Sequence, residues 1–558
     1  MRKVFVLGLD GATFDLIGPW IDSGELPNLR RIADEGVRAD LASLWPPLTP
    51  VAWPSFYMGK NPGKHGLYGY KVRQKGSYEE LPVSAADRKG RTLFEHVGDQ
   101  GGKVAVLSVP MTYPASPVNG VMVTCIFTPK LDDIWQTDCA YPPEFKEEMK
   151  RVIGTFKIHP DHQYRKGNIP DLLADYRETL KQRIDLCEHV IRTKEWDLAI
   201  TVLNETDHIQ HQVWHVHDPK HHDHDPEEFR KHGHVIKEFW KEVDRDVGRL
   251  AAALPPDATF MILSDHGHGP IYRWVHLNNM LAKKGLIRFK RSPLSLLKRA
   301  AFSLGFTPGN VYRLLLRLGV GGKKKGGGME GGGGAGKLAR RVFLSEDDID
   351  WSRTRAYATG HMGQINVNLK GREPQGTVSK SEIPALRKEI EAALAEITDD
   401  GHPVIDRLVP REELFHGETL ALASDFFVMT KDPSHQALGG ASFISNRVVE
   451  KSYGNSATHR LNGIFLMKGP GVKRGVRIDP LRIQDLASHI MWRMGLKVPA
   501  DFDGTISSGP YDDGLLDREP PQTLPLSEIK AGAGRERPLT DDEIAKMKEN
   551  LKKLGYVD

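Results

Sequence analysis

The chain of 558 residues is poor in cysteine and contains no long apolar run. Its three cysteines, Cys125, Cys139 and Cys187, lie far apart and form no CxxC pair. We therefore expect neither a disulfide framework nor a thiolate zinc site, and we predict that all three are reduced. No stretch approaches the roughly 20 apolar residues that a membrane span requires, so the sequence predicts a soluble protein that does not cross a bilayer.

The apolar run from Val4 to Leu9 is also too short for the core of a secretion signal, because Asp10 ends it. We interpret this run as a strand and expect a cytoplasmic protein. The sequence has neither a recognised nucleic-acid motif nor basic residues interleaved with aromatic ones, which argues against sequence-specific nucleic-acid binding.

Positive charge is unevenly distributed. The formal net charge is +4, yet residues 281–341 contain fifteen Lys and Arg and one acid, so the rest of the chain is acidic. Within this segment, residues 321–336 are almost entirely Gly and Lys, which predicts a flexible loop. The basic residues 283–341 fit a solvated surface, attraction of a polyanionic substrate, or peripheral contact with an anionic membrane through a basic helix that has an apolar face.

Three short apolar runs are typical of buried parallel strands, and an acidic residue follows each of them. Ligands of open α/β sheets bind beyond the carboxyl ends of the strands, so we expect Asp10, Asp207 and Asp265 to share one site. The three runs are Val4 to Leu9, Leu198 to Leu203, and Thr259 to Leu263.

Further apolar runs at Val104 to Val109 and Ile464 to Met467, with a helical pattern from Ile169 to Thr193, favour an α/β/α sandwich with a largely parallel central sheet. We assign residues 1–271 and 451–510 to the catalytic core and residues 272–450 to an inserted cap region. Residues 511–558 form a predicted C-terminal tail with an amphipathic helix, capped by Thr540 and Glu543.

Two Asp/His pairs follow the predicted strands. Asp207 and His211 are four residues apart, which places them on one face of a helical turn, and Asp265 directly precedes His266. Carboxylate and imidazole groups are suitable ligands for a divalent metal ion, although a hydrogen-bonded loop explains either pair alone equally well. Residues 208–234 contain nine histidines without a fixed spacing, which indicates a polar loop rather than a further metal site.

Several segments resemble, in order, the type I phosphodiesterase/nucleotide pyrophosphatase branch of the alkaline phosphatase superfamily. They lie between Val4 and Gly504, and the cap region fits poorly. The matching segments are Thr49, Gly59-Lys60-Asn61-Pro62-Gly63-Lys64-His65-Gly66, Asp207 with His211, Asp265-His266-Gly267, Thr458-His459-Arg460, Ile483-Gln484-Asp485, and Val498-Pro499 through Asp503-Gly504.

The resemblance implies an alkaline phosphatase-like fold and a site for two divalent metal ions, Zn²⁺ first and Mn²⁺ as the alternative. It also implies that Thr49 attacks phosphorus and forms a phosphothreonine. A threonine hydroxyl is a weak nucleophile, and a pair of cations about 4 Å apart activates such a group and stabilises phosphoryl transfer. The implied ligands are Asp207, His211 and His459 for one ion, and Asp10, Thr49, Asp265 and His266 for the other.

The expected activity is hydrolysis of a phosphodiester or pyrophosphate bond in a small-molecule or lipid-linked substrate. A phosphomonoesterase, a phosphonate hydrolase or a phosphomutase would use the same site. A membrane-surface binding protein with a structural metal site is the hypothesis from another class. The oligomeric state is not predicted.

The residue that binds the phosphoryl oxygens remains open. In the family, an asparagine three residues after the nucleophile helps to bind a phosphoryl oxygen. This chain has Ala52 at that position. Four nearby polar residues are candidates: Lys60, Lys64, Asn204 and Glu205. We expect His65 to structure its loop and His268 to lie outside the ligand set.

Overall fold

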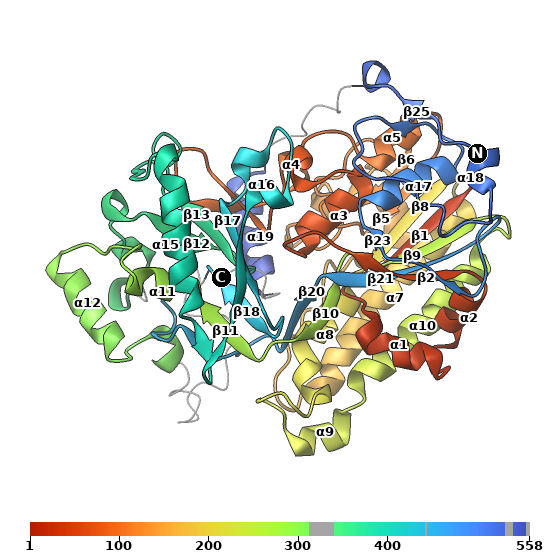
Figure 1. Cartoon of the computed structure of the whole chain (residues 1–558). Helices are drawn as coiled ribbons and strands as arrows, with labels where there is room; N and C mark the ends of the chain where they lie inside the picture. Colours follow the sequence, from red (N-terminus) through yellow and green to blue (C-terminus); the bar gives the residue numbers. More distant parts are fainter. Residues whose placement is uncertain (312–339, 441–442, 531–538, 554–558) are drawn as a thin grey trace.

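The computed structural model describes residues 1–311, 340–440, 443–530 and 539–553. Its centre is a ten-stranded sheet whose middle five strands, in the order β9-β1-β8-β5-β6, are parallel (Figure 1). These strands are β9 (Thr259–Leu263), β1 (Val4–Leu9), β8 (Leu198–Leu203), β5 (Val104–Leu107) and β6 (Gly120–Val123). The edges add β7 (Ala140–Tyr141) beside β6, and β21 (Asn462–Lys468), β2 (Val37–Ala42), β22 (Val476–Arg477) and β23 (Leu481–Arg482) beyond β9.

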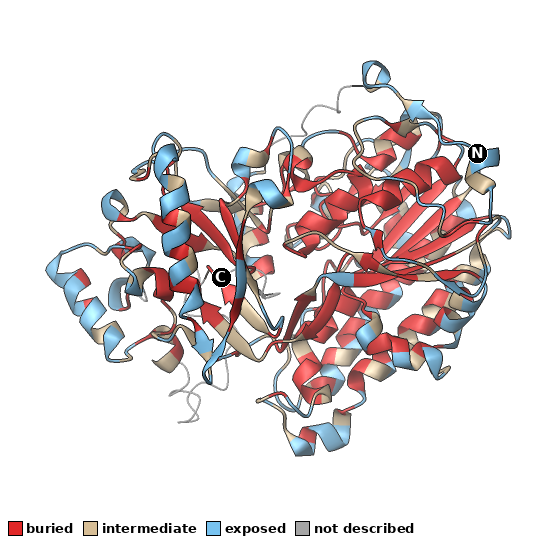
Figure 2. Ribbon diagram, in the orientation of Figure 1, coloured by how far each residue is buried: buried red, intermediate tan, exposed pale blue. Residues whose placement is uncertain are grey.

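Helices cover both faces of this sheet, and successive residues of β1 point to opposite faces. Phe5 and Leu7 pack with one apolar cluster, whereas Val4 and Val6 pack with the other. Burial on both faces explains why the middle strands are continuous apolar runs (Figure 2). The first cluster includes α1 (Phe14–Asp22), α2 (Pro27–Asp34), α6 (Phe145–Ile153), α7 (Ile169–Thr193), α8 (Glu205–His217) and α10 (Val235–Ala253); the second includes α3 (Thr49–Met58), α5 (Leu93–Asp99) and α17 (Asp485–Arg493).

The predicted α/β/α sandwich with a largely parallel sheet is therefore confirmed. β1, β8, β9 and α7 have the bounds that the sequence predicts. The other two predicted strands also form: β5 ends at Leu107, and β21 extends from Asn462 to Lys468 and pairs antiparallel to β9.

A second group of elements surrounds a four-stranded antiparallel sheet, β12-β13-β17-β16, at the left of Figure 1. A three-stranded sheet, β18-β11-β19, is formed by strands that precede and follow this sheet in the sequence. The predicted Gly/Lys loop at 321–336 lies outside the described residues. The elements are β11 (Arg273–His276), α11 (Leu277–Lys283), α12 (Pro293–Ser303), β12 (Ala356–Thr359), β13 (Gln364–Val367), α15 (Ile383–Ala395), β16 (Ile405–Pro410), β17 (Phe426–Thr430), β18 (His435–Leu438) and β19 (Val449–Lys451).

The predicted amphipathic helix of the tail is α19 (Asp541–Lys553). Its capping box forms as expected, because Thr540 N donates to Glu543 Oε2 at 2.8 Å and Glu543 N donates to Thr540 Oγ1 at 3.3 Å. Met547 and Leu551 are buried in an apolar cluster that also contains Leu48. The helix thus belongs to the apolar cluster that contains the residue before α3.

Short elements complete the described part of the chain: α4 (Pro62–His65), β3 (Lys71–Arg73), β4 (Glu80–Pro82), α9 (Pro226–His232), β10 (Gly267–Pro270), β14 (Thr398–Asp399), β15 (His402–Pro403), α16 (Arg411–Leu414), β20 (Ala457–Arg460), β24 (Val498–Pro499), α18 (Leu515–Arg518) and β25 (Thr523–Leu524). Of the helices in the described ranges, none has the length and apolar character needed to cross a membrane.

Candidate metal centre

The three predicted acids meet at the carboxyl ends of adjacent parallel strands. Asp10 follows β1, Asp265 follows β9, and Asp207 lies in the first turn of α8, directly after β8. Gly11 allows these ends to approach: it has a φ of 67°, and a Cβ atom there would lie 2.8 Å from Oδ1 of Asp207. Remote segments therefore deliver three carboxylates to one buried point.

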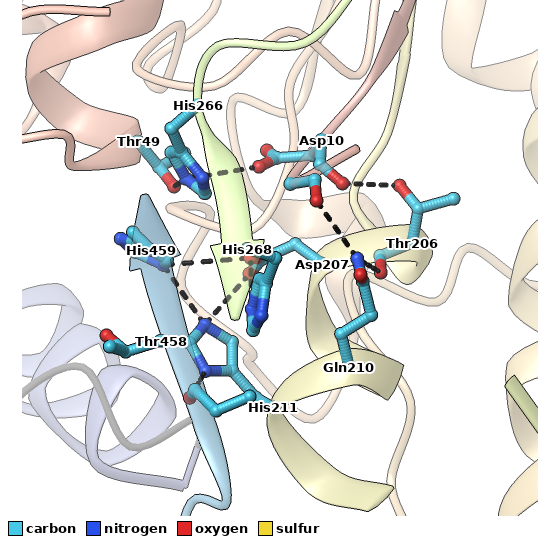
Figure 3. A network of polar contacts seen from close by, with 12 residues as sticks. Asp10, Thr49, Thr206, Asp207, Gln210, His211, His266, His268, Thr458 and His459 are labelled. Carbon is cyan, nitrogen blue, oxygen red and sulfur yellow. Dashed lines mark hydrogen bonds and ion pairs between the residues drawn. The ribbon is translucent and has the colours of Figure 1, made fainter. Parts of the chain in front are cut away.

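Three histidines direct Nε2 toward these carboxylates (Figure 3). His211 donates from Nδ1 to the carbonyl of Ala457 at 2.7 Å, and His266 donates from Nδ1 to the carbonyl of Gly267 at 3.0 Å. These bonds fix the tautomer and leave Nε2 available to a metal ion, an arrangement typical of metal-ligating histidines. His459 comes from β20, which pairs with β10.

The first cluster is centred on Asp207. His211 Nε2 lies 3.3 Å from Asp207 Oδ2, and His459 Nε2 lies 3.6 Å from Oδ1. His211 and His459 approach each other to 3.0 Å between their Nε2 atoms. The structure thus brings together all three residues of the first predicted ligand set.

His268 belongs to the same cluster, although the sequence places it outside the ligands. Its Nε2 lies 3.2 Å from Asp207 Oδ1, and its ring is buried. Asp207, His211 and His268 have ligand atoms close enough to hold one ion. The pairing of β10 with β20 explains why His268 reaches the cluster. His268 lies directly opposite His459 in this pair of strands, so both side chains project from the same face.

The second cluster joins Asp10, Asp265 and His266. His266 Nε2 lies 3.3 Å from Asp265 Oδ2 and 3.6 Å from Asp10 Oδ1. Thr49 Oγ1 lies 3.3 Å from the same nitrogen. The second predicted set is therefore also assembled, with the Thr49 hydroxyl at its edge (Figure 3).

The electrostatics of the clusters fit divalent cations. Burial, together with the charge of neighbouring carboxylates, raises the pKa of Asp10 and of Asp265. Both carboxylate oxygens of Asp265 are buried and accept no hydrogen bond from the part of the chain that the structure describes. Burying such oxygens costs free energy unless a cation coordinates them. The donor types and this cost therefore both favour binding of metal ions at the clusters.

Asp10 is held in place by two neighbours. Trp53 Nε1 donates to its Oδ2 at 3.1 Å, and Asn204 Nδ2 donates to the same oxygen at 2.6 Å. Trp53 lies in α3, the helix that begins at Thr49. Its hydrogen bond to Asp10 therefore also fixes the position of this helix relative to the carboxyl end of β1. The amide of Asn204 is thereby used to orient a candidate ligand.

The segment from Gly59 to Gly66 contacts the segment around Asp503. Both are among the segments that resemble the family, and the fold brings them together. Lys60 forms an ion pair with Asp501, and Lys64 forms one with Asp503. Both lysines are therefore neutralised at this junction. Gly59 is required there because its φ is 63° and a Cβ would lie 2.6 Å from the Phe502 ring.

His65 has the structural role that we expect. Its Nε2 lies 2.9 Å from Ser55 Oγ, and its Nδ1 accepts from the backbone N–H of Leu67 at 3.2 Å. Glu205 is also used structurally, because Arg183 Nε donates to its Oε1 at 2.7 Å. Of the four candidates for phosphoryl binding, Lys60, Lys64 and Glu205 are thus engaged in ion pairs and Asn204 in the contact to Asp10.

The histidine-rich segment contains one group, His221, His222 and Asp223, with ligand atoms close to one another. His221 nevertheless uses both ring nitrogens within the fold: Nε2 donates to the Ile271 carbonyl at 3.1 Å, and Nδ1 accepts from Asp223 N. His222 Nε2 donates to the Ser452 carbonyl at 2.7 Å. These bonds account for those ring nitrogens without a metal ion, but the prediction of a polar loop is wrong for most of the segment. Residues 208–217 belong to α8 and residues 226–232 form α9, and His208, His211, His215 and His221 are buried.

A cleft lies between the segment around Leu48 and the second group of elements. Its lining includes Leu48, which precedes Thr49, Tyr70, and Gln364 and Asn366 of β13. Neither Thr49 nor a candidate metal ligand is among its lining residues.

An α/β sandwich that gathers two Asp/His clusters beside a threonine hydroxyl at the carboxyl edge of its sheet defines a phosphohydrolase. The profile of the family "Phosphodiest: Type I phosphodiesterase / nucleotide pyrophosphatase" matches residues 4–420. The chain belongs to this family, which confirms the resemblance and the class of enzyme. No curated protein matches the sequence.

The chain is also similar to solved structures at low identity. It is 11% identical to human ectonucleotide pyrophosphatase/phosphodiesterase 5, with a TM-score of 0.49 and coverage of 93% of this chain and 99% of that one. It is 14% identical to phosphonoacetate hydrolase from Sinorhizobium meliloti 1021 in complex with phosphonoformate, with a TM-score of 0.49 and coverage of 88% and 96%.

Proposed function

We propose that this phosphohydrolase is a two-metal-dependent enzyme that cleaves phosphodiester or pyrophosphate bonds and uses Thr49 as its nucleophile. The observation that carries the proposal is the position of the Thr49 hydroxyl, 3.3 Å from His266 Nε2 and next to the cluster that contains Asp10 and Asp265. The hydroxyl oxygen attacks phosphorus and gives up its proton, the bond to the leaving oxygen breaks, and that oxygen leaves protonated. Thr49 then carries a phosphothreonine that still bears the other organic group of the substrate. Water cleaves the bond between phosphorus and Thr49 Oγ1, which releases the monoester and restores the hydroxyl.

Asp207, His211 and His459 would hold one ion, and Asp10, Asp265, His266 and Thr49 the other. The mixture of carboxylate and imidazole donors favours Zn²⁺, with Mn²⁺ as the alternative. Bound divalent ions supply activation of the hydroxyl and neutralise charge on the phosphoryl oxygens.

The preference for a diester or pyrophosphate bond rests on the family, whose description is type I phosphodiesterase / nucleotide pyrophosphatase. A phosphomonoesterase, a phosphonate hydrolase or a phosphomutase remains the alternative use of the site.

The deciding experiment compares hydrolysis of bis-p-nitrophenyl phosphate and p-nitrophenyl phosphate by the protein loaded with Zn²⁺ or Mn²⁺, and by protein treated with a chelator. We expect metal-dependent turnover that prefers the diester and is lost in Thr49→Ala, which keeps its metal. Preference for the monoester would favour the phosphomonoesterase, and turnover that survives in Thr49→Ala would refute the nucleophile.

A specific observation also favours the peripheral membrane contact predicted for residues 283–341. Helix α12 exposes Leu294 and Leu297 by 56% and 68%, and Leu304, directly after the helix, is 89% exposed. Its buried side holds polar residues, because Ser295 and Lys298 bond to Asp348. Arg291, Arg299, Arg340 and Arg341 are exposed along or beside this helix.

We propose that this helix lies on anionic lipid headgroups at the cytoplasmic face of a membrane, where apolar side chains enter the interface and arginines meet phosphates. Sedimentation with vesicles tests the contact. Binding to vesicles with anionic lipid, absent with neutral lipid and lost in Leu294→Ser/Leu297→Ser, would support it. Leu526→Ser is the matched control, because Leu526 is 66% exposed elsewhere. Equal binding by all variants, or self-association through α12, would contradict it.

A further inference from the structure

Trp53 connects the helix of the candidate nucleophile to a candidate metal ligand. Thr49 and Trp53 are four residues apart in α3, so their side chains lie on the same face of the helix, about one turn apart. From this face, Trp53 Nε1 donates to Asp10 Oδ2 at 3.1 Å. Thr49 Oγ1 lies 3.3 Å from His266 Nε2. One helical turn therefore contacts two members of the second cluster.

The indole of Trp53 is closely packed against the strand that ends at Asp10. Trp53 is fully buried, and a Cβ atom at Gly8 of β1 would lie 2.4 Å from the indole Cη2. The ring also meets Phe56 edge to face, with 5.8 Å between the centroids. Glycine at position 8 thus allows the indole to approach β1 two residues before the carboxylate to which it donates.

The two carboxylate oxygens of Asp10 have different surroundings. Oδ2 accepts hydrogen bonds from Trp53 Nε1 and from Asn204 Nδ2. Oδ1 is buried, lies 3.6 Å from His266 Nε2, and accepts no hydrogen bond from any residue in the described ranges. Because an indole N–H can only donate, Trp53 holds Oδ2 and leaves Oδ1 for a cation. Asp10 is thereby prepared to bind an ion through one oxygen.

We propose that Trp53 is a positioning residue that holds Asp10 as a one-oxygen metal ligand and keeps the Thr49 hydroxyl aligned with it. The inference rests on the proposed function and goes beyond it, because it identifies what aligns the nucleophile with the second cluster. Hydrogen-bond partners of a ligating carboxylate orient it, and their loss typically weakens metal binding by about 10- to 100-fold. Since the indole belongs to the helix of Thr49, its hydrogen bond acts on the nucleophile as well as on the ligand.

The test is Trp53→Phe, which keeps an aromatic ring against β1 and removes the N–H donor. Titration of metal-free protein with Zn²⁺ against a competing chelator should show that the affinity for one of two ions falls by about tenfold or more. At saturating Zn²⁺, kcat for the diester should fall by about 10- to 100-fold at an unchanged KM. A misplacement of about 1 Å at a reacting group has an effect of this size.

Trp196→Phe is the matched control for the loss of a buried indole N–H. Trp196 is 2% exposed, packs on Phe5 near the other end of β1, and donates from Nε1 to the Ile191 carbonyl at 3.0 Å. This variant should bind Zn²⁺ and turn over the diester as the wild type does.

A second variant separates the hydrogen bond from the packing of the ring. Site-specific replacement of Trp53 by 3-benzothienylalanine keeps the double ring and exchanges the N–H for sulfur, which cannot donate. The same losses of Zn²⁺ affinity and kcat are expected, with circular dichroism showing that the protein is folded.

Wild-type affinity and kcat in the benzothienyl protein would overturn the role of Trp53 and leave the proposed function intact. Weaker Zn²⁺ binding with wild-type kcat at saturating metal would overturn the link to Thr49. A wild type that binds no divalent metal ion would overturn the inference together with the proposed function, so the two failures are distinguishable.

Discussion

Arg183 of α7 donates from Nε to Oε1 of Glu205 at 2.7 Å, and only 1% of either side chain is exposed. Arg183 also donates from Nη2 to the carbonyl of Ile158 at 2.7 Å. Glu205 is the first residue of α8, two positions before Asp207. The ion pair therefore anchors the turn that presents a candidate metal ligand to the structural helix behind it.

Glu205→Gln should destabilise the fold by about 3 kcal/mol, because it leaves the Arg183 charge buried without its partner. Denaturant unfolding of the metal-free protein measures this cost. The double variant Arg183→Met/Glu205→Gln is the control and should recover much of the stability, since it removes both charges. A single variant as stable as the wild type would show that the pair is dispensable.

Removing a predicted ligand should remove metal. Asp265→Asn and His459→Ala, one from each cluster, should each lower the bound metal measured by mass spectrometry and abolish turnover. Thr49→Ala is the control that should lose turnover but retain metal, because the remaining ligands of its cluster are carboxylates and imidazole. Full metal content in both ligand variants would refute the ligand assignment.

His268 gives a separate prediction, because its imidazole lies 3.2 Å from the carboxylate of Asp207. His268→Asn should weaken the affinity for the ion held by Asp207 by roughly tenfold or more, whether the ring coordinates the ion or orients its ligand. Titration of metal-free protein against a competing chelator measures the change. His221→Asn, in the neighbouring loop, should match the wild type, and equal affinity in both variants would leave His268 outside the centre.

Acid should destabilise the fold through a histidine far from the metal centre. Burial lowers the pKa of His489 to about 4, and its Nδ1 lies 2.6 Å from the hydroxyl of Tyr511. The ring must stay neutral in the folded state but takes up a proton near pH 6.5 when unfolded, so its contribution is complete above pH 6.5 and is lost as the pH falls toward 4. At pH 5 the loss amounts to about 2 kcal/mol.

Unfolding curves between pH 7.5 and 4.5 test this dependence. His489→Gln should show a shallower decline of unfolding free energy with acid than the wild type. His402→Gln is the control, because His402 is exposed and should leave the slope unchanged. Equal slopes for all three proteins would contradict the prediction.

The sequence predicts the sheet well because its middle strands are buried on both faces. Such strands leave an uninterrupted apolar run with a polar residue at its end, and β1, β8 and β9 are bounded in this way. The acids that follow them were accordingly predicted to meet. The placement of His459 depended instead on the family resemblance, because β20 reaches the site by pairing with β10, and no local periodicity encodes that pairing.

One feature escaped the sequence for a physical reason. His268 lies on a strand of four residues with two glycines, which has too few side chains to reveal which face is buried. Its place in the site is set by the partner strand β20 rather than by its neighbours in the chain.

The pairing of β20 with β10 also has a consequence for biosynthesis. As the chain leaves the ribosome, Asp10, Asp207 and Asp265 can be gathered as soon as β9 has joined β1, but His459 arrives only with β20. Until β20 has been made, the first ligand set lacks His459. Completion of the centre, and with it the capacity to cleave phosphate esters, is thus a late event in the making of each molecule.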